Sequence, residues 1–70
     1  MKRRVLMTLI SKRVRELQLQ NVVYREGSNH SQLIIGNKKI PIPRHKEIDE
    51  NLARYIMKEL ESELGERWWI

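Results

Sequence analysis

Residues 22–42 read VVYREGSNHSQLIIGNKKIPI, and this stretch decides the fold of the chain. Residues that favour strands, chiefly valine, isoleucine and tyrosine, concentrate in three segments: 22–25, 30–35 and 38–42. The segments are short and only a few residues separate them, so consecutive strands can pair side by side. The stretch therefore predicts a three-stranded antiparallel meander.

The residues between these segments favour turns. Gly27-Ser28-Asn29 supplies a flexible glycine and two small polar side chains. Gly36-Asn37 is a two-residue loop whose leading glycine is typical of a type II′ hairpin turn. Pro41 lacks the N–H group that a central strand needs, so the third strand is expected at an edge of the sheet.

An amphipathic helix is expected on each side of the strands. The first spans about residues 4–19 with a stop at Gln20-Asn21, and its apolar stripe holds Val5, Leu6, Leu9, Ile10, Val14 and Leu17. The second begins after Asp49, a favourable N-cap residue, and ends near Leu64-Gly65. Its apolar face holds Ile48, Leu52, Tyr55, Ile56, Leu60 and Leu64.

The predicted order is α-β-β-β-α, an α+β fold with two helices packed on one face of a three-stranded antiparallel sheet. This is also the layout of the double-stranded-RNA-binding domain. A chain of 70 residues suffices for one small domain, so residues 1–70 are expected to form a single unit with 66–70 as a tail. Trp68 and Trp69 in that tail either fold back to complete a thin core or dock on a partner protein.

The net charge of +5 is unevenly distributed along the chain. Residues 1–45 hold ten Lys/Arg and two acids, a balance of +8, whereas residues 46–70 hold four Lys/Arg and seven acids, a balance of −3. Such asymmetry indicates one face that attracts a polyanion such as RNA. The alternative is a small basic domain that binds no nucleic acid.

Composition argues against several other classes of protein. The sequence has no cysteine and only two histidines, so neither a disulfide framework nor a zinc site is expected, and no cofactor is implied. The apolar run at 5–10 is too short for a membrane span and lacks a small-residue cleavage site, which favours a cytoplasmic location.

His30 is the leading candidate for chemistry, because it follows Gly27-Ser28-Asn29 at the start of a strand. Histidine titrates near neutral pH and is the usual general acid or base. The alternative interpretation is an ordinary surface histidine.

A second set of candidates adjoins the third strand. Arg44 is suited to clamping a phosphate. His45 precedes a helix N-terminus, where the dipole disfavours an imidazolium, so it is also explained as a loop residue that shapes the helix entry. Lys38 and Lys39 either contact phosphates or keep an edge strand charged against aggregation.

Gly27-Ser28-Asn29-His30, followed at this distance by Pro43-Arg44-His45, resembles the signature of the HicA family, the toxins of bacterial HicA–HicB toxin–antitoxin pairs. The resemblance extends over about residues 22–65, including the strand Leu33-Ile34-Ile35 and the helix with Ile56 and Leu60.

This resemblance implies a small mRNA interferase that cuts RNA without a metal ion and is neutralised by a HicB-like antitoxin. It assigns the catalytic role to His30. The expected RNA contacts are Gly27, Ser28, Asn29, Lys38, Lys39, Arg44 and His45. The free protein is expected to be a monomer or weak dimer. The alternative function is a non-catalytic RNA-binding module that uses the same basic face.

Overall fold

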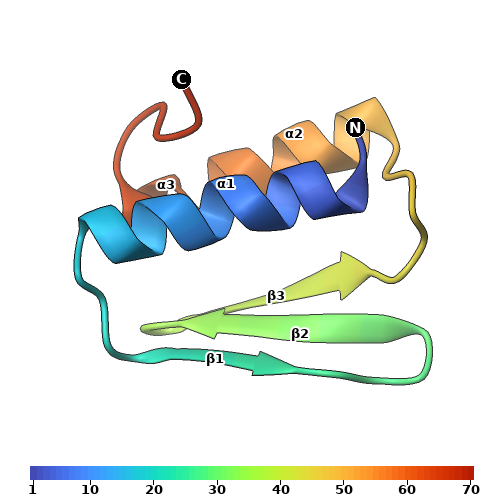
Figure 1. Cartoon of the computed structure of the whole chain (residues 1–70), viewed down its shortest axis with the longest axis horizontal. Helices are drawn as coiled ribbons and strands as arrows, with labels where there is room; N and C mark the ends of the chain where they lie inside the picture. Colours follow the sequence, from blue (N-terminus) through green and yellow to red (C-terminus); the bar gives the residue numbers. More distant parts are fainter.

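All the helices lie on one face of a three-stranded antiparallel sheet (Figure 1). The computed structural model describes residues 1–70. Its elements are, in chain order, α1 (Arg3–Glu16), β1 (Val22–Arg25), β2 (His30–Ile35), β3 (Lys38–Pro43), α2 (Glu50–Glu59) and α3 (Glu61–Leu64). This arrangement confirms the α-β-β-β-α order and the meander. No helix is both long and apolar enough to cross a membrane.

The register of the sheet separates a helix-facing side from an open side. On the central strand β2, Ser31, Leu33 and Ile35 are buried, whereas His30 before them and Gln32 between the first two are exposed. Alternate side chains of a strand point to opposite faces, so His30 and Gln32 lie on the open face. The strand order β1-β2-β3 leaves β3 at an edge, as its proline predicts.

The hairpin between β2 and β3 turns at Gly36-Asn37, as predicted. Gly36 has a φ of +58°, and Asn37 has no positive φ, which agrees with the type II′ expectation. A side chain at Gly36 would also collide with the Glu63 carboxylate of α3, since a Cβ there would lie 2.7 Å from Oε2.

α1 ends earlier than the prediction of residues 4–19. The helix stops at Glu16, and Gln18 adopts the left-handed conformation at φ 55°. The N–H groups of Gln18 and Leu19 then donate to the carbonyls of Arg15 and Val14, the bonding pattern of a Schellman cap. The prediction was wrong because glutamine is not a usual residue for this conformation, whereas the expected stop contained an asparagine.

The second predicted helix begins as expected and is divided near its end. The Asp49 side chain accepts hydrogen bonds from the N–H groups of Asn51 and Leu52, which confirms it as the N-cap of α2. α2 ends at Glu59, and the N–H of Leu60 is shared between the carbonyls of Ile56 and Lys58. The short helix α3 follows directly.

The core lies between the helices and the inner side of the sheet. Its thirteen buried residues are Leu6, Ile10, Leu33, Ile35, Ile40, Ile42, Ile48, Ala53, Ile56, Met57, Leu60, Leu64 and Trp68. Four residues predicted on the apolar stripes are exposed instead: Val5, Leu17, Leu52 and Tyr55. On α2 the buried face includes Ala53 and Met57, which the prediction omitted. Ala53 has a small side chain, and Met57 lies outside the four-residue repeat on which the prediction was based.

The C-terminal tail folds back onto the core. Trp68 is only 8% exposed, and its indole N–H donates to the Met57 carbonyl at 2.8 Å. Trp69 packs edge-on against Trp68 with ring centroids 5.8 Å apart, while Ile70 remains exposed. Of the two interpretations of this tail, the structure supports completion of the core.

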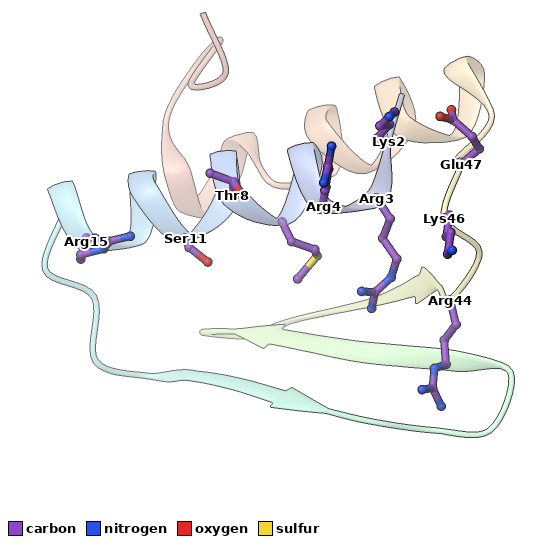
Figure 2. A pocket seen from close by; sticks show the side chains of 10 residues that line it. Lys2, Arg3, Arg4, Thr8, Ser11, Arg15, Arg44, Lys46 and Glu47 are labelled. Carbon is purple, nitrogen blue, oxygen red and sulfur yellow. The ribbon is translucent and has the colours of Figure 1, made fainter.

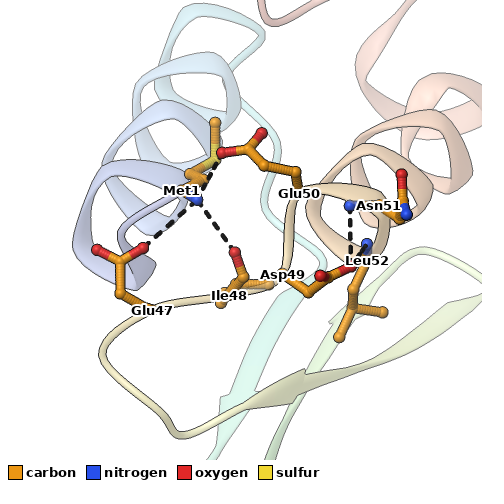
Figure 3. Close-up of polar contacts among 7 residues, drawn as sticks. All are labelled: Met1, Glu47, Ile48, Asp49, Glu50, Asn51 and Leu52. Carbon is orange, nitrogen blue, oxygen red and sulfur yellow. Dashed lines mark hydrogen bonds and ion pairs between the residues drawn. The ribbon is translucent and has the colours of Figure 1, made fainter.

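A separate set of contacts joins the start of α1 to the start of α2 (Figure 3). The Met1 ammonium donates to the Ile48 carbonyl at 3.0 Å and to the Glu50 carboxylate at 2.8 Å, and Glu47 lies 3.6 Å from it. The hydrogen bond to Glu50 raises the pKa of the Met1 ammonium above its ordinary value. The same contact lowers the pKa of the Glu50 carboxyl.

We expect Trp68→Phe to lower the free energy of unfolding by about 1–3 kcal/mol, because the Met57 carbonyl would lose its hydrogen-bond donor inside the core. Trp69→Phe is the matched control, since Trp69 is only partly buried and makes no hydrogen bond through its indole. Urea unfolding of the three proteins measures the difference. Equal stability of the two variants would contradict a core role for Trp68.

We expect Glu50→Gln to lower the melting temperature at pH 7 and to lower it progressively less as the pH falls below the ordinary range of a glutamate carboxyl. The folded-state pKa of Glu50 is depressed, so its contribution is present above the unfolded pKa and is lost as pH falls through the folded one. The raised pKa of the Met1 ammonium means that the pair is also lost as pH rises through that value. Glu66→Gln, at an exposed carboxylate without an ion pair, serves as the control. A destabilisation by Glu50→Gln that stays the same from pH 7 down to low pH would refute the pairing.

Candidate RNA-cleavage site

His30 is the first residue of β2, and its exposed side chain lies on the open face of the sheet. Its cross-strand neighbour is Pro43, the last residue of β3. The start of β2, the end of β3 and the loop before β2 surround a shallow, open pocket of about 370 Å³. The residues lining it are Arg25, Glu26, Gly27, His30, Ser31, Gln32 and Pro41. We call this the His30 pocket.

The loop preceding His30 depends on Gly27. A Cβ at Gly27 would collide with the backbone carbonyl oxygen of His30, so only glycine lets the loop approach the strand this closely. Ser28 and Asn29 form the exposed bend between them. Of the predicted Gly27–His30 stretch, Gly27 and His30 line the pocket, whereas Ser28 and Asn29 do not.

Arg44 is held next to this loop. Its guanidinium donates a hydrogen bond to the Gly27 carbonyl and lies 3.3 Å from the Glu26 carboxylate. The Arg44 side chain remains 47% exposed, so its other N–H groups can reach a bound anion. Because Arg44 directly follows the cross-strand partner of His30, the two predicted residues lie at the same end of the sheet.

The structure does not bring the two predicted lysines to His30. Lys38 lies at the opposite end of the sheet, where its Nζ is 3.4 Å from the Glu59 carboxylate of α2. Lys39 pairs with Ile34, four residues along β2 from His30, which corresponds to about 13 Å of strand. His45 is exposed in the connector between β3 and α2.

Arg3 is a residue of this region that the sequence analysis missed. Its guanidinium donates to the Tyr24 hydroxyl, to Ser31 Oγ at 3.1 Å and to the Pro43 carbonyl at 2.8 Å. It therefore contacts all three strands from the first turn of α1. Arg3 shares the helix face of Leu6 and Ile10 at spacings of three and seven residues, and a charged residue on an apolar stripe is the signal that could have identified it.

Few groups near His30 carry titratable or metal-binding chemistry. Glu26 is the one carboxylate that lines the pocket, and it pairs with Arg44. No group of three or more His, Asp or Glu side chains is arranged to hold a metal ion. The residues present offer proton transfer by an imidazole and charge stabilisation by a guanidinium.

A larger hollow of about 930 Å³ runs along the outer side of α1 (Figure 2). Its lining residues are Lys2, Arg3, Arg4, Met7, Thr8, Ser11, Arg15, Arg44, Lys46 and Glu47. We call it the α1 groove. Of these ten residues, only Arg44 was predicted from the sequence as a site residue.

We expect Arg3→Met to lower the free energy of unfolding by about 1–3 kcal/mol, because the partly buried Pro43 carbonyl and Ser31 hydroxyl would lose a donor. Arg4→Met removes the same charge from an exposed neighbour without a hydrogen bond, so it should have a far smaller effect. Chemical denaturation of both variants tests this. A loss no larger for Arg3→Met than for Arg4→Met would contradict the inferred role.

Comparison with known proteins identifies a relative. The chain is 36% identical over 47 residues to the probable mRNA interferase HicA 2 of Photorhabdus laumondii, and the match covers 64% of this chain and 81% of that protein. No family model matches the sequence. No solved structure matches it either. The identity and the coverage of the Photorhabdus protein show that this chain belongs to the HicA family.

Proposed function

We propose that this chain is an endoribonuclease that cuts mRNA with His30 as its catalytic residue. Two observations support the proposal. The Photorhabdus relative is named an mRNA interferase. In addition, the exposed His30 imidazole lies at the end of the sheet where the loop carbonyl of Gly27 holds the Arg44 guanidinium. This juxtaposition of a proton-transfer group and a fixed cation is the observation that carries the proposal.

The proposed reaction is an internal transfer at one phosphodiester of the RNA. The 2′-hydroxyl oxygen forms a bond to the adjacent phosphorus, and its proton passes to the neutral His30 imidazole. The bond from phosphorus to the 5′-oxygen of the next nucleotide breaks, and that oxygen takes up a proton from water or from a protonated imidazole. The products carry a 2′,3′-cyclic phosphate and a 5′-hydroxyl.

Arg44 is proposed to stabilise the negative charge that develops on the phosphoryl oxygens. Because Glu26 lies 3.3 Å from this guanidinium, RNA binding would replace a protein carboxylate with a phosphate at the same cation. Gly27 and the exposed bend of Ser28 and Asn29 are proposed to contact the RNA beside the cut bond. Lys39 and His45 are proposed to contact it farther away, and a contact with Lys38 requires separation from Glu59.

The proposed reaction uses no metal ion, and the catalytic power of the site is correspondingly modest. A single proton-transfer residue contributes about 10²–10⁴ in rate. The remainder must come from positioning of the RNA and from electrostatic stabilisation. Such a rate suits a toxin that acts on mRNA in a growing cell more than a degradative nuclease.

The proposed protein partner is a HicB-type antitoxin that neutralises the enzyme. The His30 pocket is shallow and open, so a bound protein surface would exclude RNA from it. In the free state the chain is proposed to be a cytoplasmic monomer or weak dimer.

We expect wild-type protein to cut a long unstructured RNA in excess EDTA and His30→Ala to lose cleavage while still binding RNA. The wild-type products should carry 2′,3′-cyclic phosphate ends, which mass spectrometry identifies. His45→Ala removes the other histidine, in the connector, and should slow cleavage far less.

Cleavage by His30→Ala at the wild-type rate would refute the catalytic assignment. Loss of wild-type cleavage in EDTA, restored by a divalent cation, would refute the metal-independent step. Binding without cleavage by every protein, wild type included, would favour the non-catalytic RNA-binding module.

A further inference from the structure

The cations that line the α1 groove outnumber the acidic side chains that pair with them. Six of its ten lining residues are cations and one is an acid, Glu47. Of the six cations, only Arg44 forms an ion pair. Lys2, Arg4, Arg15 and Lys46 have no acidic partner, and all four are exposed. Uncompensated cations gathered in one hollow favour binding of an anion.

The cations and hydroxyls of α1 form a regular stripe within this groove. Arg4, Thr8, Ser11 and Arg15 follow one another at spacings of four, three and four residues, so they share one face of the helix (Figure 2). The helix rise separates Arg4 from Arg15 by about 16 Å along the axis. Charges spread over such a length suit an extended polyanion better than a small anion, which needs donors that converge on one point.

Two side chains connect the groove to the His30 pocket. Arg44 lines the groove and donates to the carbonyl of Gly27, which lines the pocket. Arg3 also lines the groove and donates to the hydroxyl of Ser31, which lines the pocket and directly follows His30. The two hollows are therefore neighbours at the same end of the molecule.

We propose that the α1 groove binds the phosphate backbone of the RNA segment adjoining the segment held at His30. This inference rests on the proposed function, since it makes the groove the continuation of the same RNA site. The phosphates are contacted by four cations, Lys2, Arg4, Arg15 and Lys46. The hydroxyls of Thr8 and Ser11, which lie between Arg4 and Arg15, donate hydrogen bonds to the same backbone. The groove reads no bases, so it contributes affinity and register without sequence preference.

The test uses Arg4→Gln/Arg15→Gln in a His30→Ala background, so that RNA is bound and not cut. Affinity for a long unstructured RNA is measured over a range of salt concentrations. Each lost phosphate contact should reduce the slope of log affinity against log salt by about 0.7 for a single strand, so the double variant should reduce it by about 1.4. Arg54→Gln/Lys58→Gln, on the exposed surface of α2, removes the same charge and should leave the slope unchanged.

An unchanged slope in the Arg4/Arg15 variant would overturn the proposal, and so would an equal reduction in both double variants. An unchanged slope would indicate that the groove binds a partner other than RNA, such as an acidic protein surface. The readout is binding by an inactive protein, so it does not depend on the chemistry at His30. Absence of RNA cleavage by the wild-type protein would refute the proposed function and leave the slope measurement valid.

Discussion

The arrangement of this protein depends most on the hydrogen bonds that the Arg3 guanidinium donates to the sheet. It donates to Tyr24 of β1, Ser31 of β2 and the Pro43 carbonyl of β3, so one side chain from α1 contacts all three strands. These contacts fix the end of the sheet at which β2 begins and β3 ends. The α1 groove reaches the same end through Arg44, which lines the groove and donates to the Gly27 carbonyl in the loop before His30. The packing of α1 on the sheet thus brings the α1 groove to the end of the sheet where the His30 pocket lies.

Much of the fold could be predicted because it depends on local chemistry. The three strands and their turns follow from β-branched residues interrupted by glycine and asparagine, and Asp49 is a strong N-cap. The features that were predicted wrongly depend on contacts with the rest of the fold. The end of α1 is set by Gln18 in a left-handed conformation, and the buried face of α2 is set by which side chains meet the sheet.

The candidate site could be predicted where its residues are close in sequence or are joined by the pairing of neighbouring strands. Gly27, Asn29 and His30 share one loop and strand, and Arg44 meets them because antiparallel pairing joins the start of β2 to the end of β3. Lys38 and Lys39 are nearer to His30 in sequence than Arg44 is, yet pairing places them toward the other end of the sheet. The cations of α1 could not be assigned, because nothing local indicates which face of that helix lines a groove with Arg44 and Lys46.

In the proposed mode of binding, the His30 pocket and the α1 groove form one RNA-binding site. An NMR titration with an RNA oligonucleotide of 2′-O-methyl riboses, which lacks the attacking hydroxyl, tests it most directly. Side-chain signals of His30, Arg4 and Arg15 should shift together and fit a single dissociation constant. Shifts at the arginines without any at His30, or separate dissociation constants for the two regions, would contradict the account.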